Sequence, residues 1–124
     1  MKKIMIIWSG FLLVYLLTAC GGAPTPPPTS AEFVLQFDGA PDPVKQPVSV
    51  ALDNQGNVYV IDLSNFRIQK FDSNGKPLTQ WGTVGSGDAG EGEFSSTADV
   101  ALDPQGNVYI ADYDNDRVQK FRQR

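Results

Sequence analysis

An acid and a base recur at the same spacing at two places in this 124-residue chain. Asp62 is followed by Arg67 and Asp112 by Arg117, with an asparagine between the members of each pair. Residues of these types can form an ion pair beside a side-chain-stabilised turn, or can belong to a catalytic site. We expect structural ion pairs, because a catalytic group need not recur in every copy of a repeat.

The second copy also has carboxylates at alternate positions, as at the start of a calcium-binding loop. These are Asp112, Asp114 and Asp116. An EF-hand loop then requires glycine at its sixth position and glutamate at its twelfth, where this chain has Arg117 and Gln123. The first copy lacks the alternating carboxylates, so the triplet is not part of the repeat. We therefore predict at most adventitious Ca²⁺ binding and no dedicated metal site.

The composition excludes several kinds of catalytic site. The chain contains no histidine, so it can form neither a histidine-ligated zinc site nor a Ser-His-Asp triad. A further acidic group, Asp88, Glu91 and Glu93, lies in a glycine-rich stretch and is expected to be a solvated loop rim. The sequence thus predicts no catalytic residue and no cofactor.

The acid–base pairs belong to a segment that the chain contains twice. Residues 51–71 and 101–121 agree at 14 of 21 positions, at a constant offset of 50 residues. Self-similarity at a period of about 20–50 residues is typical of repeat architectures, in which each unit packs on its neighbours.

Each copy has the pattern of short antiparallel strands. Val58–Ile61 and Val108–Ile110 are β-branched and aromatic runs that follow glycine-containing turns. Residues 67–71 alternate polar and apolar side chains, and Asn74-Gly75 then forms a hairpin signal before residues 78–81. One unit is therefore four short strands joined by tight turns, as in a propeller blade.

The pattern Ala-Leu-Asp-x-x-Gly-Asn-Val-Tyr, followed by Asp-x-x-Asn-x-Arg and Gln-Lys-Phe, resembles the NHL repeat. The resemblance covers roughly residues 31–124, with one departure: Thr97 stands where the first copy has Pro47. It implies an all-β, partial and open β-propeller. Its parts would be two blades of four-stranded antiparallel sheet, at about 47–82 and 97–124, plus a leading strand at 32–37.

The resemblance also bears on packing and completeness. Residues 98–121 supply only three strands, which the leading strand would make four if the two ends met. We expect Phe94 to pack between the blades and Tyr59, Tyr109 and Trp81 to serve packing as well. Propellers have typically about 4–8 blades. Three resolutions stay open: a homo-oligomer, for example three chains making six blades; a truncated fragment; or an open pair with exposed edges.

The start of the chain predicts export. Lys2 and Lys3 precede an apolar run from Ile4 to Leu17, and small residues then lead to Cys20, the single cysteine. This is typical of a signal helix, and its end resembles the lipobox of bacterial lipoproteins. A plain transmembrane anchor is the alternative, although the run is shorter than the roughly 20 residues that spanning requires.

On the lipoprotein interpretation, residues 1–19 are a signal peptide and Cys20 is lipidated. Residues 20–30 are then a proline-rich tether, and residues 31–124 form the repeat region. Cleavage would leave 8 basic and 14 acidic residues, a balance that argues against nucleic-acid binding.

The functional hypothesis is a non-catalytic, membrane-anchored NHL-repeat lipoprotein that binds or scaffolds a protein or carbohydrate. It would lie outside the cytoplasm, on the cell membrane or the outer membrane. Related propellers include lactonases and an amidating lyase, so a remnant or subunit of such an enzyme is the alternative. A truncated fragment without independent function is a further one.

Overall fold

The computed structural model describes residues 31–87 and 89–123. The predicted signal peptide, Cys20 and the tether therefore lie outside the described residues. The chain divides into two units, Met1–Phe33 and Val34–Arg124, and the second contains both repeats. The architecture below is that of the second unit.

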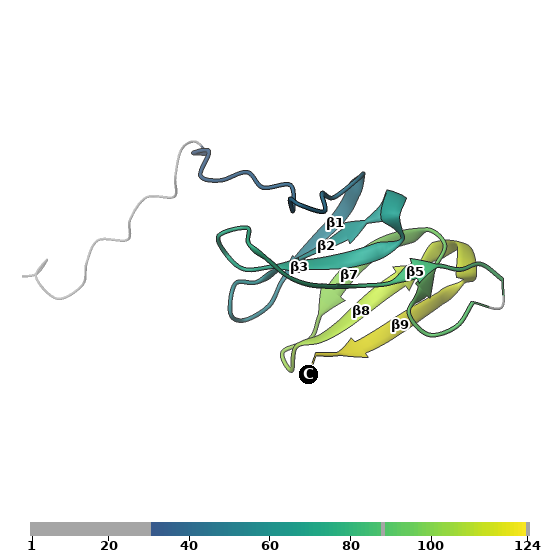
Figure 1. Ribbon diagram of the computed structural model, residues 1–124. Helices are drawn as coiled ribbons and strands as arrows, with labels where there is room; N and C mark the ends of the chain where they lie inside the picture. The colour runs from purple at the N-terminus through teal and green to yellow at the C-terminus, as the bar shows by residue number, and fades with distance from the viewer. Residues whose placement is uncertain (1–30, 88, 124) are drawn as a thin grey trace, which may run out of the picture. The chain divides into compact units, whose positions relative to one another are not determined.

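Each repeat forms its own antiparallel sheet, with the strands adjacent in sequence order (Figure 1). The first sheet contains β1 (Pro47–Leu52), β2 (Val58–Asp62), β3 (Arg67–Phe71) and β4 (Pro77–Trp81). The second contains β7 (Thr97–Leu102), β8 (Asn107–Asp112) and β9 (Arg117–Arg122). Short 3₁₀ turns, η1 (Leu63–Asn65) and η2 (Tyr113–Asn115), follow β2 and β8. The prediction of an all-β, partial and open propeller-like fold is confirmed.

The long loop between the sheets has a small element of its own. β5 (Thr83–Val84) and β6 (Glu93–Phe94) form a short parallel pair, which brings the two ends of the loop together. This pairing could not be predicted from the sequence, because a two-residue strand is too short to show a periodic pattern.

The turns explain why both copies fold in the same way. In the first copy, Asp53 accepts a hydrogen bond from the backbone N–H of Gly56 at 3.0 Å, and its carboxylate accepts from Asn57. Asp103 makes the matching bonds in the second copy. Gly56 has a φ of 80°, a left-handed conformation that glycine adopts without steric cost.

The strand register also repeats. Pro47 pairs with Asp62 in the first sheet, and Thr97 pairs with Asp112 in the second, each followed by an irregularity in the ladder. Replacing proline by threonine at this position therefore leaves the start of the second blade unchanged.

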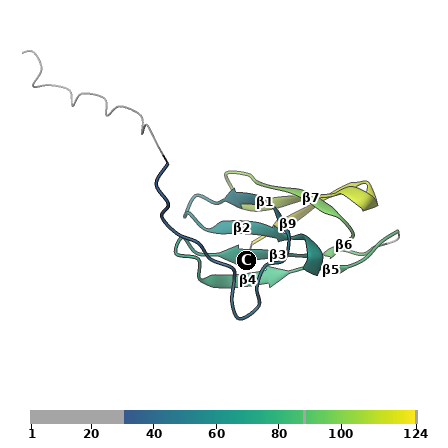
Figure 2. The same ribbon diagram turned by 90° about the horizontal axis from the view of Figure 1, so that it is seen from above.

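The core lies between the two sheets. Its fully or nearly fully buried members are Tyr59, Ile61, Ile68, Phe94, Val100, Val108 and Ile110. The innermost strands β1 and β7 lie side by side (Figure 2). Phe94 packs between the sheets as predicted, with its ring 6.0 Å from that of Phe121. Trp81 and Tyr59 also serve packing, since their rings lie 6.4 Å apart edge to face.

Two details of the predicted fold are wrong. Within the described residues the second sheet has three strands rather than four, and residues 32–37 do not form the predicted leading strand. A strand exists only where another edge supplies its hydrogen bonds, and none of the described strands pairs with residues 32–37. The Phe37 ring nevertheless packs 4.9 Å from Phe71, much as Trp81 packs 5.9 Å from Phe121 in the next repeat.

Candidate functional site

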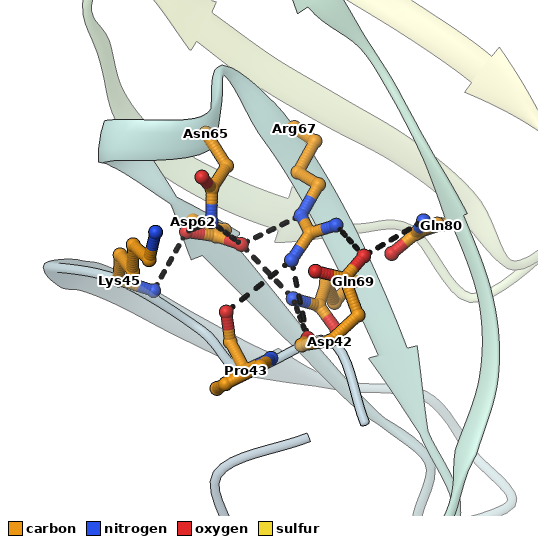
Figure 3. A network of polar contacts seen from close by, with 8 residues as sticks. All are labelled: Asp42, Pro43, Lys45, Asp62, Asn65, Arg67, Gln69 and Gln80. Carbon is orange, nitrogen blue, oxygen red and sulfur yellow. Dashed lines mark hydrogen bonds and ion pairs between the residues drawn. The ribbon is translucent and has the colours of Figure 1, made fainter. Parts of the chain in front are cut away.

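The first acid–base pair lies at one end of the first sheet, where β2 ends at Asp62 and β3 begins at Arg67 (Figure 3). Asp62 is fully buried, and Arg67 places its Nε 2.6 Å from one carboxylate oxygen. The other donors to this carboxylate are the Lys45 backbone N–H at 2.8 Å, the Asn65 amide at 2.9 and 3.0 Å, and the Gln69 amide at 2.9 Å. Both carboxylate oxygens are therefore occupied by donors.

Arg67 also forms hydrogen bonds with the loop that precedes β1. Its guanidinium donates to the carboxylate of Asp42 and to the backbone carbonyls of Asp42 and Pro43, the latter two at 3.2 and 3.3 Å. Gln69 and Gln80 also donate to Asp42, to its carbonyl and its carboxylate respectively, both at 3.3 Å. The pair thus fastens the loop to the sheet.

The second pair repeats this arrangement with different partners. The Asp112 carboxylate accepts from Arg117 Nε at 3.0 Å, from the Ser95 backbone N–H at 3.1 Å, and from the amides of Asn115 and Gln119 at 2.9 and 3.3 Å. The remaining nitrogens of Arg117 donate to three loop carbonyls, those of Ala89, Gly90 and Glu93, at 2.6 to 2.9 Å. This pair fastens the loop before β7.

The surroundings of these carboxylates keep them ionised. Burial works to raise the pKa of Asp62, but the hydrogen bonds from Asn65, Lys45, Gln69 and Arg67 hold that pKa below its ordinary value. Burial and hydrogen bonds oppose each other in the same way at Asp112, whose pKa is also lowered. In both carboxylates each oxygen accepts at least one hydrogen bond, so the charge is stabilised by protein donors.

The pKa of Arg67 is raised, whereas the pKa values of the two aspartates are lowered. Its hydrogen bond to Asp42 acts first to raise the pKa of Arg67, and the bond to Asp62 adds to this effect against the opposing effect of burial. The cluster is therefore a charged network that holds its ions through charge-assisted hydrogen bonds.

The sequence did not predict several members of these networks, among them Gln80, which donates to Asp42. Gln69 and Gln119 bond to the aspartates from matching positions, and Asp42 supplies a second carboxylate in the first repeat only. The two glutamines occur in both copies, so their recurrence was a usable signal. Asp42 has no counterpart to reveal it, because the loops before β1 and β7 differ in length and sequence.

The other acidic residues are not gathered into a site. Asp114 and Asp116 are exposed, and Asp116 ends η2 with a left-handed φ of 50°. Glu93 accepts the backbone N–H of Gly90 at 2.7 Å, within the loop it belongs to. Across residues 31–87 and 89–123, no three carboxylates, cysteines or histidines come together as metal ligands. Cys20 lies outside the described residues.

The family comparison agrees with the repeated geometry. The model of the NHL repeat matches residues 45–71 and 94–121, the two segments that contain the acid–base pairs. Two segments of the chain are therefore similar to the NHL repeat. Such repeats indicate a β-propeller-type module for protein interaction or scaffolding. No curated protein matches the chain. Within the described ranges, the structure has no helical segment with the length and apolar character that a bilayer crossing requires.

Proposed function

We propose that this NHL-repeat protein is a non-catalytic binding module that a lipidated Cys20 anchors outside the cytoplasm, on the cell membrane or the outer membrane. The observation that supports the non-catalytic part is that both carboxylate oxygens of Asp62 and of Asp112 accept hydrogen bonds from the protein. These are the buried acids that recur in both repeats, and each is filled by donors that fasten a loop. The module therefore offers surfaces rather than reacting groups.

The proposed anchor is supported by the sequence around Cys20. A basic start, an apolar run and small residues before a single cysteine are typical of a lipoprotein signal. A lipid chain attached there would hold the tether and the repeats at the membrane surface through its buried methylene groups.

The proposed class of ligand follows from the balance of acidic and basic residues in the module. With 14 acidic residues against 8 basic ones beyond residue 19, the module lacks the cationic surface that nucleic acid requires. A protein or a carbohydrate is the partner that we propose for it.

The anchor is tested by expressing the full chain in a bacterial host with labelled palmitate and measuring the mass of the purified product. We expect label in the membrane fraction and a chain that begins at a modified Cys20. Cys20→Ser should lose both, whereas the tether variant Ser30→Ala should keep both. Label that persists in Cys20→Ser, or an unmodified wild-type cysteine, would contradict the anchor.

The alternative of a lactonase- or lyase-type enzyme is tested separately, by assaying hydrolysis of a lactone series with and without Ca²⁺. We expect no turnover above the buffer rate. Turnover that requires Ca²⁺ and disappears in Asp114→Asn, but persists in the loop variant Glu91→Gln, would establish catalysis and replace the proposal. A cooperative thermal transition of the full chain would separate a folded module from a fragment without an independent fold.

A further inference from the structure

We propose that the exposed face and edge of the second sheet bind a second copy of this chain head to tail, with residues 34–37 of that copy adding a fourth strand beside β9. This inference concerns assembly, and it depends neither on the lipid anchor nor on the ligand proposed above. Its template is the interface that the chain already makes between its own two sheets.

That internal interface covers one face of the first sheet. Ile61 and Ile68, paired across β2 and β3, are both fully buried there against the second sheet. The matching pair on the second sheet is Ala111 and Val118, and Val118 is 67% exposed. The face that is buried in the first repeat is therefore uncovered in the second, although its residues remain apolar.

A pocket on this uncovered face marks where a neighbour would insert. It is lined by Ala98, Ala111, Asp112, Tyr113, Asp116, Arg117 and Val118. At the equivalent place in the first repeat, Phe94 packs with Ile61, Ile68 and Leu63, and its ring lies beside the backbone of Phe66 and Arg67 at Gly82. The vacant pocket is thus the second copy of the place that Phe94 fills. By the 50-residue offset, its occupant would be Val44 of the other chain.

The opposite face of the molecule has the matching apolar surface. Val50 and Leu52 on β1 are 61% and 63% exposed. Their counterparts on β7 are Val100, which is buried in the internal interface, and Leu102, which packs against it. One chain therefore exposes both halves of an interface that it forms once internally. Two complementary but different faces make a heterologous contact, which closes into a ring when the rotation between blades allows it.

The edge of the second sheet has room for the added strand. β3 is paired on its outer edge by β4, whereas none of the described strands pairs with the outer edge of β9. Beside that edge lies a groove of about 710 Å³ lined by Trp81, Gly82, Phe121 and Arg122, among others. The indole N–H of Trp81 is buried without an acceptor among the described residues. An extended segment in this groove would complete the fourth strand.

Residues 34–37 suit that role in sequence and in position. Val-Leu-Gln-Phe at 34–37 parallels Leu-Thr-Gln-Trp at 78–81, which forms β4 of the first sheet. Phe37 already packs on Phe71 of its own first sheet, as Trp81 packs on Phe121 of the following sheet. The segment therefore occupies the place of the outer strand of a preceding blade, where only the β9 edge of another chain is missing.

The polar contact between the innermost strands is also compatible with a second copy. Inside the chain, the Ser49 hydroxyl donates to the Asp99 carboxylate at 2.6 Å, and these two residues are 50 positions apart. At the proposed junction, Asp99 would again face a Ser49, that of the other chain, so a hydroxyl meets a carboxylate and no like charges oppose each other. Two, three or four chains would close rings of four, six or eight blades, the range of known propellers.

The register gives a direct test. Lys70 pairs with Thr79 in the first sheet, so Lys120 should lie opposite Leu35 of the neighbouring chain. In the full chain carrying Cys20→Ser, purified in a mild detergent, the pair Leu35→Cys and Lys120→Cys is oxidised gently. We expect disulfide-linked oligomers on a non-reducing gel. The control pair Leu35→Cys and Asp114→Cys, with both cysteines also exposed, should stay mostly uncrosslinked. Equal crosslinking of the two pairs would overturn the proposed register.

The mass in solution tests the assembly itself, by light scattering after subtraction of the detergent. We expect a mass of two to four chains for the wild type and for Val84→Asp, and a single chain for Val118→Asp. Val84 is 65% exposed and lies on neither proposed face, so it controls for adding a charge to an exposed valine. Both variants should keep a cooperative melt, because neither changes the core. A wild-type monomer at the highest soluble concentration, or equal masses for the two variants, would contradict the proposal.

Discussion

The two repeats share most of their sequence and differ in how much of it is buried. Ile68 is fully buried and its counterpart Val118 is 67% exposed, while the Arg67 side chain is 11% exposed and that of Arg117 is 29% exposed. The first sheet has the second sheet on one face and the 38–46 loop fastened to the other. Within the described residues, the second sheet has a neighbouring sheet on one face, and Val118 on the other face is exposed. In a repeat protein, burial thus depends on the neighbour at least as much as on the residue itself.

The two acid–base pairs, Asp62–Arg67 and Asp112–Arg117, each fasten a loop and are called clamps below. They differ in the same way as the sheets. In the first repeat, Arg67 bridges two carboxylates, those of Asp62 and Asp42. In the second, Arg117 pairs with the Asp112 carboxylate and otherwise bonds to loop carbonyls. Both fasten the loop that leads into the sheet. The first uses three charges, of which Asp62 and Arg67 are buried and Asp42 is exposed, whereas in the second the arginine is more solvated.

The largest expected effect concerns the residue between the sheets. Phe94→Ala removes a fully buried ring from the core and should cost about 3–5 kcal/mol of unfolding free energy. Val44→Ala, at the matching position before the first repeat, should cost about 1 kcal/mol, because Val44 is only half-buried. Urea denaturation of the full chain measures both. Similar losses for the two variants would show that the sheets do not pack through Phe94.

Removing the clamp acids should give the next largest effect and should distinguish the repeats. Asp62→Ala removes the buried carboxylate that accepts from Arg67 Nε and from the Gln69 amide, leaves Arg67 Nε–H unpaired, and should cost about 3 kcal/mol. Asp112→Ala should cost less, because water reaches Arg117 and can replace the lost carboxylate. The comparison is made by chemical denaturation, and a larger loss for Asp112→Ala would refute the difference between the clamps.

Lowering the pH should destabilise the fold by protonating Asp53 and Asp103, the aspartates that accept hydrogen bonds within the turns. Burial opposes ionisation of Asp53, but hydrogen bonds from Asn57 and Gln55 and the charge of Lys70 lower its pKa from 3.8 to about 2. Because the folded pKa lies below the unfolded one, this stabilisation is present above about pH 4 and is lost as the pH falls toward 2. It should amount to about 2 kcal/mol.

The matching variants test this assignment. Asp53→Asn should flatten the fall in melting temperature between pH 4 and 2, and it should do so more than Glu91→Gln, a loop variant outside the turns. An unchanged acid profile in Asp53→Asn would show that other carboxylates carry the dependence. Asp103→Asn extends the comparison to the second repeat, where hydrogen bonds from Asn107 lead the lowering of the pKa against opposing burial.

The smallest expected effect is at the end of η2. Asp116 holds a left-handed φ of 50°, which glycine adopts at no steric cost. Asp116→Gly should therefore stabilise the chain by about 0.5–1 kcal/mol. Asp114→Gly, within the same turn but without a positive φ, should destabilise it slightly. Thermal unfolding measures both, and a stabilising Asp114→Gly would remove the conformational explanation.

The internal repeat made most of the fold predictable. The strands, the glycine turns and the role of Phe94 all follow from patterns that occur twice or lie between the two copies. The failures occur where a partner decides the structure. Residues 32–37 have strand-forming side chains but no edge among the described strands to bond to. For the same reason, the described part of the second sheet has no fourth strand beside β9. In the clamps, Asp42 was unpredictable because its contact with Arg67 depends on the fold of a loop that has no counterpart.

Amide hydrogen exchange, measured as a function of protein concentration, distinguishes an open second sheet from one that a second copy closes. We expect the amides of β3 to exchange slowly at every concentration, since β2 and β4 pair both of its edges. We expect the β9 amides that are not bonded to β8 to exchange quickly in dilute protein and to become protected as the concentration rises. Exchange at β9 that is independent of concentration would contradict closure by a second copy.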